Sequence, residues 1–245
     1  MFYVFADAFG LGIKKYKQPR KPAQIPTTSL RNQLWTAAAV GQVVLLPAVA
    51  WVVYPLVRWL GAPEFTAEVP ALRDVAVQLM LSKLWADVGF YFAHRALHMP
   101  ELYSRFHKQH HSFKGTIAPA AEFAHPVEQV VANHIPSLGG AFVQGAHPLV
   151  FLVWLTQRMT GTYEHRSGYC FKGTWADTLQ ITDSLGARYH DWHHTANVGC
   201  YGAEWLDWLC GTMDEFWASE GKRVLMLSAV YYTIFIYNKY THAEQ

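Results

Sequence analysis

Charged side chains are scarce in this chain of 245 residues, since Asp, Glu, Lys and Arg make up only 16% of it, whereas about a quarter is usual for a soluble domain. Hydrophobic residues make up 51%, and there are 10 Trp, 13 Tyr and 14 Phe. Apolar surface need not be hidden in lipid, and Trp and Tyr gather at the membrane interface. The mean hydropathy of +0.03 shows that an apolar part and a polar part share the chain.

Cysteines are also few. Cys170, Cys200 and Cys210 form no CxxC pair and are odd in number, which argues against a disulfide framework and favours a cytosol-facing core. No basic patch interleaved with aromatic residues is present, so we do not expect the protein to bind nucleic acid. The HExxH signature of zinc proteases is missing as well.

Uncharged stretches predict membrane helices. The stretch 34–57 contains no charged residue and is long enough to cross a bilayer core. A second span is predicted over 75–93, although it contains Lys83 and Asp87. Charges at membrane depth are costly and tend to be functional. The alternative is that the helix leaves the bilayer near Lys83, so that both charges are already in water.

A third uncharged stretch, 129–157, is interrupted by glycine and proline. It is too long for one straight helix and short for two full spans, so a hairpin that enters the membrane and returns is predicted. The apolar run 224–237 is short for a span and fits a segment on the surface. The predicted organisation is an N-terminal segment with a basic cytosolic loop (1–33), a catalytic domain that includes the spans (34–217), and an apolar C-terminal segment and tail (218–245).

The distribution of charge predicts the orientation. Positive residues outnumber acids before the first span, whereas the loop 58–74 holds two positive residues and three acids. The positive-inside rule therefore places the N-terminal side in the cytosol. The second span then returns to the cytosol near residue 93, and both flanks of the hairpin are cytosolic. The positive residues before the first span are Lys14, Lys15, Lys17, Arg20, Lys21 and Arg31.

Histidine is abundant, with 13 residues, and most lie in three clusters on the predicted cytosolic flanks. Residues at i, i+3 and i+4 share a helix face, so each cluster is expected to project its imidazoles together. We therefore predict an all-α membrane bundle with a cytosol-facing, histidine-rich domain that holds two metal ions. The clustered histidines are His94 and His98, then His107, His110 and His111, then His190, His193 and His194.

Eight imidazoles indicate two metal ions. Imidazole suits iron, zinc and copper, and two ions of coordination number five or six need roughly eight to ten ligands, whereas one structural zinc takes about four. His165 and His125 are further candidate ligands, with a purely structural role as the alternative. His134, His147 and His242 are interpreted as structural or incidental.

Two carboxylates are candidates for orienting the ligating imidazoles, as partners of metal-bound histidines often do. They are Asp87, next to the first cluster, and Asp191, within the third. For Asp191 the alternative is a solvated residue on the surface of a helix.

The order HxxxH, HxxHH, HxxHH resembles that of the membrane-bound fatty acid hydroxylase and sterol desaturase superfamily, and finer features resemble the C4-methylsterol oxidases. The narrowest of these is Ala-Glu-Phe-Ala-His-Pro-Val-Glu at 121–128. The other similar segments are 87–98, 106–111, 165–169, 189–194, 205–207 and 211–212. The chain departs from the family pattern at Ala86, where an acid is usual, at the inserted Arg166, and at Cys200, where an Asn-Tyr pair is usual.

The resemblance implies a fold, a chemistry and partners. It implies two iron ions and dioxygen, with electrons from NAD(P)H delivered through cytochrome b5. It also implies a multi-pass protein of the endoplasmic reticulum membrane whose site faces the cytosol. A sterol would slide from the bilayer to the metals, and its C4-methyl group would become alcohol, aldehyde and acid in turn, the acid being decarboxylated by another enzyme. The eight clustered histidines would be ligands, with His165 and His125 added to them.

Two other functions stay open. The first is a different lipid oxygenase of the same superfamily, namely a sterol C5 desaturase, a sterol or sphingoid-base hydroxylase, or an aldehyde decarbonylase. The second is a non-catalytic membrane scaffold that keeps the fold and one structural metal ion. The scaffold predicts fewer than two metals per chain and no consumption of oxygen.

Overall fold

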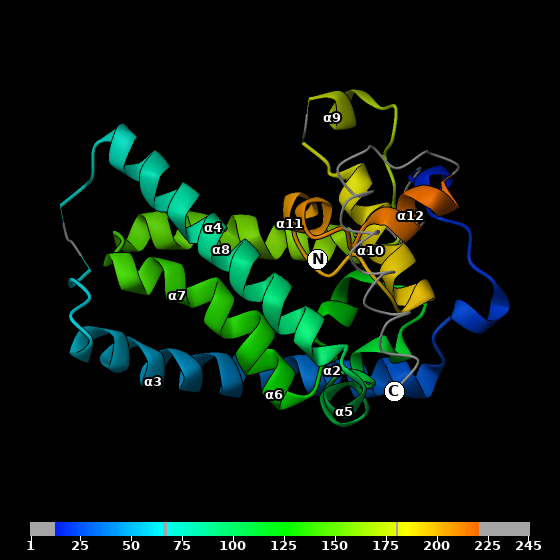
Figure 1. Cartoon of the computed structure of the whole chain (residues 1–245), viewed down its shortest axis with the longest axis horizontal. Coiled ribbons are helices and arrows are strands. Elements are labelled where there is room, and N and C mark those ends of the chain that lie inside the picture. The colour runs from blue at the N-terminus through cyan, green and yellow to red at the C-terminus, as the bar shows by residue number, and fades with distance from the viewer. Residues whose placement is uncertain (1–12, 66–67, 180, 221–245) are drawn as a thin grey trace, which may run out of the picture.

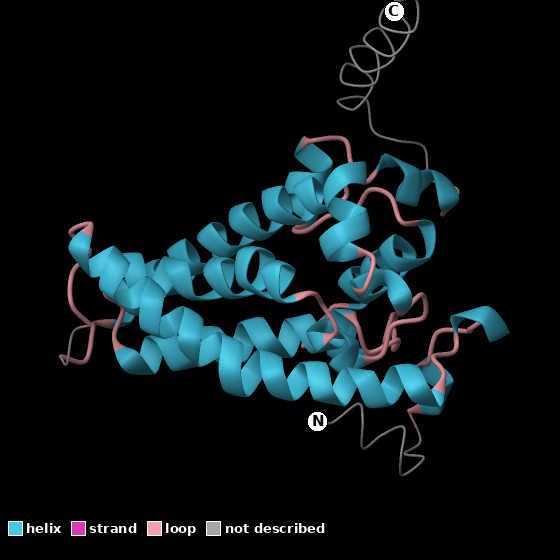
Figure 2. Cartoon of the chain, turned by 90° about the horizontal axis from the view of Figure 1, so that it is seen from below, coloured by secondary structure: helices cyan, strands magenta, loops and turns pink. Residues whose placement is uncertain are grey.

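The computed structural model describes residues 13–65, 68–179 and 181–220, and within these ranges every regular element is a helix or helical turn, as predicted. Four long helical elements, α3 (Leu46–Trp59), α4 (Leu72–Leu97), α7 (Ile135–Gln144) and α8 (Pro148–His165), run together along the long axis (Figure 1). Shorter helices and turns gather at one end of this bundle. Figure 2 shows the same separation after a rotation of 90°.

The first helical stretch is apolar and exposed. It joins α2 (Thr28–Val40), the π-helical turn η3 (Gly41–Leu45) and α3, and it begins where Thr27 Oγ1 accepts a hydrogen bond from Leu30 N. Val43 and Trp51 are 73% and 79% exposed. Among the described residues, only the stretch Pro22–Trp59 is both long and apolar enough to cross a membrane. The first predicted span, 34–57, lies within it.

Helix α4 contains the second predicted span and continues beyond it. Its C-terminal turn presents His94, and His98 forms its C-cap. The two charges inside it pair with each other, since Lys83 Nζ lies 2.5 Å from Asp87 Oδ2. Trp205 Nε1 also donates to Asp87 Oδ2, at 3.0 Å. The Lys83 side chain is 60% exposed but that of Asp87 only 12%. Of the two charged groups, only the Lys83 ammonium therefore lies at the surface of the protein.

The stretch predicted as a hairpin forms two helical arms. The first arm comprises α6 (Pro126–Glu128), η7 (Gln129–His134) and α7, and the second is α8, which extends to His165. The chain reverses at Gly145, whose φ of 57° lies in the left-handed region that favours glycine. Gly140 lets α7 approach α4 closely, because a Cβ there would lie 2.9 Å from Ser82 Cα.

The second histidine cluster does not lie on one regular helix, contrary to the expectation of a shared helix face. After α5 (Pro100–Leu102), His107 ends the π-helical turn η4 (Tyr103–His107), and His110 starts the 3-10 turn η5 (His110–Ser112). Only the third cluster lies within a regular helix, α10 (Ser184–Ala196). The remaining elements are η1 (Lys14–Tyr16), η2 (Pro22–Gln24), η6 (Ala118–Glu122), α9 (Trp175–Thr178), α11 (Glu204–Leu209) and α12 (Asp214–Ser219).

The basic N-terminal loop packs against the histidine-rich end. Gln18 N donates to Gly168 O at 2.8 Å, and Cys170 N donates to Tyr16 O at 2.8 Å. Arg20 forms an ion pair with Asp191 of α10. The loop is thereby held across the third histidine cluster. The predicted apolar segment 224–237 and residues 1–12 lie outside the described residues.

Candidate metal centre

The eight clustered histidines converge in two adjacent groups. In each group the potential ligand nitrogens lie within 4.8 Å of one another. The two groups are in contact, because the rings of His111 and His194 stack with their centroids 4.6 Å apart. The first group is His94, His98, His107, His111 and His193, and the second is His110, His190 and His194.

Neighbouring residues serve different groups. His110 and His111 are consecutive, yet one belongs to each group, and the same holds for His193 and His194. Consecutive side chains point in different directions on a helical turn, so an HxxHH sequence can contribute to two metal positions at once. The paired histidines of the motif therefore have a physical role that single histidines could not fill.

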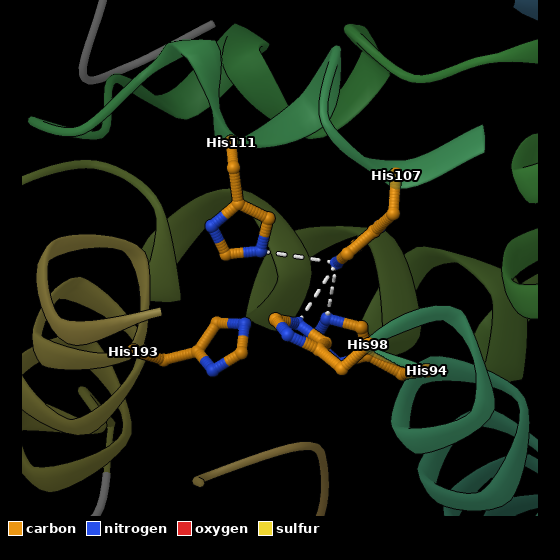
Figure 3. A group of neighbouring side chains, drawn as sticks. All are labelled: His94, His98, His107, His111 and His193. Carbon is orange, nitrogen blue, oxygen red and sulfur yellow. Dashed lines mark hydrogen bonds between the residues drawn. The ribbon is translucent and has the colours of Figure 1, made fainter. Parts of the chain in front are cut away.

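The first group has the geometry of a metal site (Figure 3). His107 Nε2 lies 3.1 Å from His94 Nε2, 3.0 Å from His98 Nε2 and 3.0 Å from His111 Nε2. A neutral imidazole has one N–H donor and one acceptor, so His107 Nε2 cannot form three hydrogen bonds. His193 Nε2 is buried and has no hydrogen-bond partner. A cation bound among these nitrogens would satisfy them together, and the residues therefore fit a metal ion.

The second group contains fewer protein nitrogens. His190 Nε2 and His194 Nε2 are 2.9 Å apart, and the His110 ring lies 4.7 Å from the His194 ring, centroid to centroid. All three histidines are buried. A metal ion here would have three protein ligands rather than five, which leaves more of its coordination sphere to other ligands.

Backbone carbonyls orient several of the imidazoles. His94 Nδ1 lies 2.5 Å from Tyr201 O, His193 Nδ1 lies 2.6 Å from Gly199 O, and His110 Nδ1 lies 3.3 Å from Phe123 O. An imidazole that donates its Nδ1–H to a carbonyl keeps the Nε2 lone pair free for a metal ion. These contacts fix both the tautomer and the direction of each ring.

The loop after the third cluster supplies two of those carbonyls because its backbone is unusual. Asn197, Gly199 and Cys200 have φ values of 60°, 58° and 55°. Left-handed conformations at non-glycine residues are uncommon and are kept where the surroundings fix them. Cys200, which departs from the family pattern, lies between the two residues of this turn whose carbonyls contact imidazoles, Gly199 at His193 and Tyr201 at His94.

A buried carboxylate holds this loop in place. Asp207 is fully buried and accepts hydrogen bonds from Tyr201 N and Gly202 N, each at 2.8 Å, and from Thr212 Oγ1 at 2.6 Å. The Tyr189 hydroxyl donates to the same carboxylate. Asp207 lies in the family-like segment 205–207, but the local sequence does not predict these partners, because Tyr189 and Thr212 are brought to it by the fold.

Glu128 is a second buried acid at the centre, and it was not among the carboxylates predicted to orient imidazoles. Its Oε2 atom lies 2.9 Å from His107 Nδ1, and the residue is buried. Burial raises the pKa of Glu128, and the positive charge of Arg166 opposes this effect. Glu128 therefore contacts Nδ1 of His107, whose other ring nitrogen, Nε2, lies near three other imidazoles.

Replacing Glu128 with leucine is expected to weaken metal binding by about 10- to 100-fold, because partners that orient ligating imidazoles have effects of this size. The measurement is metal affinity from titration with a competing chelator. Glu101→Leu is the matched control, because Glu101 is exposed on α5. Equal affinities for wild type and Glu128→Leu would show that Glu128 does not position His107.

Burial keeps the clustered imidazoles neutral. It lowers the pKa of His110 from 6.5 to about 3, with a further contribution from the positive charge of Arg166. It also lowers the pKa values of His107 and His190 below their ordinary range, with nearby histidines and Arg166 adding to the effect. Neutral imidazole is the form that binds metals, so the centre is prepared for a cation at neutral pH.

The metal-free protein is therefore expected to lose stability as the pH falls from about 6.5 toward 3. In this window the unfolded chain binds a proton at each of these histidines and the folded chain does not, so the free energy of unfolding decreases by up to about 1.4 kcal/mol per pH unit per histidine. Melting temperatures in EDTA between pH 7.5 and 5 test this. His110→Gln should give a shallower dependence. A melting temperature that does not change with pH would contradict it.

His165 and His125, the two additional candidate ligands, lie outside both groups. His165 Nε2 is 2.8 Å from Asp183 Oδ2, and its side chain is 35% exposed. His125 forms the N-cap of α6, where its Nδ1 accepts a hydrogen bond from Val127 N at 3.2 Å. Each ring nitrogen named here thus has a partner in a structural contact, and the two groups comprise the eight clustered histidines.

The candidate acids Asp87 and Asp191 likewise have other partners. Asp87 is engaged by Lys83 and Trp205, as described above. Asp191 binds Arg20 and accepts a hydrogen bond from Thr116 Oγ1 at 3.1 Å. Asp191 is buried rather than solvated, and it anchors the N-terminal loop to α10. The hydrogen-bonding contacts to ring nitrogens at the centre come from backbone carbonyls, and Glu128 Oε2 lies 2.9 Å from His107 Nδ1.

Two tyrosine rings cover the first group. The Tyr201 ring lies 5.0 Å from that of His98, and the Tyr103 ring lies 5.8 Å from that of His111, centroid to centroid. Both rings therefore pack against imidazoles of the first group as aromatic neighbours. Of the histidines interpreted as structural, His147 caps α8 by accepting a hydrogen bond from Leu149 N at 3.1 Å, and His242 lies outside the described residues.

Comparison with known proteins found a matching family and several relatives. Residues 79–212 match the model of a family described as fatty acid hydroxylase. The chain is 34% identical to fatty acid hydroxylase ahd1 of Mycosarcoma maydis over 83% of its own length and 50% of that protein. It is 30% identical to fatty acid hydroxylase domain-containing protein 2 of Macaca fascicularis, over 88% of the chain and 62% of the relative.

A third relative is named for its activity on sterols. The chain is 30% identical to methylsterol monooxygenase erg25B of Aspergillus fumigatus, over 86% of the chain and 71% of the relative. The chain thus spans half to three fifths of the first two relatives and more of the third. No solved structure matches it.

Proposed function

The chain belongs to the fatty acid hydroxylase family, and from this premise we propose that it is a di-iron, dioxygen-dependent oxygenase that oxidises the C4-methyl group of a sterol intermediate. The observation that carries the proposal is the convergence of eight imidazoles in two adjoining groups. A structural zinc site would use about four ligands, so the second group of histidines would have no purpose in a scaffold.

The protein's own residues bind, orient and shield the metals. Five histidines would hold one iron ion and three the other, with carbonyls and Glu128 fixing the rings. Bound iron would supply the activation of dioxygen that oxidation of an unactivated methyl group requires. Burial keeps the ligands unprotonated, and the rings of Tyr103 and Tyr201 pack against the first group.

The choice of a methylsterol rests on segment 121–128 and on the relative named methylsterol monooxygenase. That segment is the narrowest part of the resemblance, and it contacts both metal groups. Phe123 O faces His110 of the second group, and Glu128 faces His107 of the first. A sequence feature typical of methylsterol oxidases thus lies where it can affect the chemistry.

The proposal includes a membrane and partners. Large exposed apolar side chains, among them Val43, Trp51 and Leu152 at 73%, 79% and 59% exposure, support burial of the bundle in lipid. We place the protein in the endoplasmic reticulum membrane as a multi-pass protein whose histidine site faces the cytosol. Electrons would come from NAD(P)H through a cytochrome b5-type donor.

Sterol analysis tests the function directly. The chain is expressed in a yeast strain that lacks its own C4-methylsterol oxidase, and sterols are measured by mass spectrometry. The proposal predicts that C4-methylsterols decline and that the C4-carboxylic acid or its demethylated product appears. A His193→Ala variant should leave the sterols unchanged.

Two other results would point elsewhere. Unchanged sterols together with new hydroxylated sphingoid bases, desaturated sterols or alkanes would assign a different lipid to the same metal centre. Unchanged lipids, no oxygen consumption and fewer than two metals per chain would favour the scaffold.

A further inference from the structure

Two stretches of the chain that carry positive charge without any acid meet at the histidine-rich end. Residues 13–63 contain no Asp or Glu, and neither do residues 102–121. The first stretch includes the basic N-terminal loop, and the second includes the second histidine cluster. We call the exposed basic residues of these two segments, before α2 and between α5 and η6, the basic face. They are Lys14, Lys15, Lys17, Lys21, Arg105, Lys108 and Lys114.

Hydrogen bonds and close packing join the two segments. Gln24 Nε2 donates to Thr195 Oγ1 at 3.1 Å, and the same oxygen lies 3.4 Å from Lys114 O. A Cβ atom at Gly115 would lie 2.5 Å from Gln24 O, so the two backbones approach each other closely. Arg20 Nη2 also donates to the backbone of the second segment, at Thr116 O. Positive charges from distant parts of the sequence are therefore brought together.

The contacts of this loop leave its lysine charges at the surface. Arg20 is the residue that pairs internally, because it forms an ion pair with the buried carboxylate of Asp191. Lys17 instead places its Nζ atom 5.5 Å from the centre of the Tyr169 ring. A contact with an aromatic face holds a lysine without neutralising it. The basic face therefore presents a positive potential to the solvent.

This face lies beside the second metal group. Thr195, which joins the two segments, is exposed and directly follows His194. Lys108 and Lys114 lie on either side of His110 in the second segment. His110 and His194 belong to the three-histidine group. A protein bound to the basic face would therefore lie next to that group, with a short path through the chain to its ligands.

The basic face points away from the apolar part of the bundle. Figure 1 shows the loop 13–27, in dark blue, at the end of the molecule opposite the connection between α3 and α4. Highly exposed apolar side chains such as Trp51 and Leu152 lie on the long helices between these two ends. If the long helices lie in a bilayer, the lysines project into the aqueous phase beyond it. This placement favours a soluble protein domain over lipid headgroups as the partner.

We propose that the basic face docks an acidic protein that carries single electrons and delivers them to the metal centre. The inference rests on the proposed oxygenase function and identifies the surface and the charge of its electron donor. Conversion of a C–H bond and O2 to C–OH and water takes up two electrons and two protons, so a one-electron carrier has to dock repeatedly. Complementary charge speeds such encounters, and electron-transfer complexes are accordingly small and short-lived.

Binding kinetics test the proposal without relying on turnover. The full chain in nanodiscs of neutral lipid is immobilised, and the soluble haem domain of an acidic cytochrome b5 is passed over it in a surface plasmon resonance experiment. A basic cytochrome c is the control of opposite charge. We expect the acidic protein alone to bind, with an association rate constant that falls about tenfold or more between about 50 mM and about 500 mM salt. Equal binding of the two cytochromes would overturn the proposal.

Charge reversals locate the surface. Lys114→Glu should lower the association rate constant by about threefold, and Lys21→Glu/Lys114→Glu by about tenfold or more, with a weaker dependence on salt. Arg73→Glu is the matched control for the single reversal, because Arg73 is exposed near the start of α4, at the opposite end. The double variant should keep the iron content and melting temperature of the wild type. Binding that is unchanged in the double variant would contradict the assignment.

Hydrogen exchange distinguishes the protein partner from lipid. Exchange of the amides of residues 14–24 is compared in nanodiscs with and without phosphatidylserine, and we expect no difference. Protection by phosphatidylserine, together with no preference for the acidic cytochrome, would show that the basic face binds headgroups and that the proposal is wrong.

Metal analysis separates this inference from the proposed function. If the chain holds fewer than two metals but binds the acidic cytochrome through Lys21 and Lys114, the oxygenase proposal fails and the docking surface stands. If two irons are bound and sterols are oxidised while neither reversal affects binding, the docking surface fails and the oxygenase proposal stands.

Discussion

Replacing His107 with alanine is expected to reduce sterol oxidation by more than about 100-fold, which exceeds the loss caused by removing a partner of a metal ligand. His107 Nε2 lies within 3.1 Å of three other imidazole nitrogens, so its removal opens the middle of the five-histidine group. The iron content should fall from about two per chain to at most one. Activity is measured as formation of the C4-oxidised sterol, and iron by mass spectrometry.

Two companion variants make this result specific. His194→Ala alters the three-histidine group and should also lower the iron content to at most one, but with the five-histidine group intact. His125→Ala removes a half-buried imidazole that belongs to neither group, so it should keep both irons. A His107→Ala protein with full activity would exclude His107 as a ligand, and equal metal loss in His125→Ala would show that the effect is not specific to the two groups.

Replacing Asp207 with asparagine is expected to weaken metal binding and to destabilise the fold. Tyr201 N–H and Gly202 N–H donate to different oxygens of the carboxylate, so the NH2 group of asparagine places a donor against one of them. An unsatisfied buried group costs about 1–3 kcal/mol, so the melting temperature should fall. The carbonyls of the same loop orient His94 and His193, so metal affinity should also fall by about 10- to 100-fold.

Glu215→Gln is the matched control for Asp207→Asn, because Glu215 is an exposed acid in the adjoining helix α12. Thermal unfolding and chelator titration are measured for both variants. If Asp207→Asn lowers stability but leaves metal affinity unchanged, the loop does not position the imidazoles. If it changes neither property, the four hydrogen bonds to Asp207 do not contribute as the structure indicates.

The histidine spacing carried most of the information about the site. The i, i+3, i+4 pattern places imidazoles on one side of α10, and the resemblance across segments 87–98, 106–111 and 189–194 pointed to the same eight residues. Local spacing cannot, however, say which histidines share a metal ion. The division of His110 from His111, and of His193 from His194, depends on how η5 and α10 meet in three dimensions.

The partners of the imidazoles were harder to predict, for a physical reason. Asp87 and Asp191 are near histidines in the sequence, but in the fold they are drawn to Lys83 and Arg20, which are stronger partners for a carboxylate than a neutral ring. The groups that contact the imidazoles are mostly backbone carbonyls, and every residue has one. Only the three-dimensional course of the chain around Gly199 shows which carbonyls are used.

The helical bundle was predictable in outline. Uncharged stretches located the first helical stretch, and the glycines and prolines near residue 145 located the reversal between α7 and α8. The second predicted span, 75–93, lies within α4, although Lys83 and Asp87 interrupt its apolar character. Their mutual ion pair, together with Trp205, allows the helix to continue through them.

The number of metal ions per chain tests the central claim most directly. Protein expressed with sufficient iron and purified in detergent is analysed by mass spectrometry for iron and zinc, beside the His107→Ala variant. Two histidine groups predict about two iron ions per chain in the wild type and at most one in the variant. Fewer than one metal ion per chain, with no difference between the two proteins, would contradict the claim that these eight histidines build a two-metal centre.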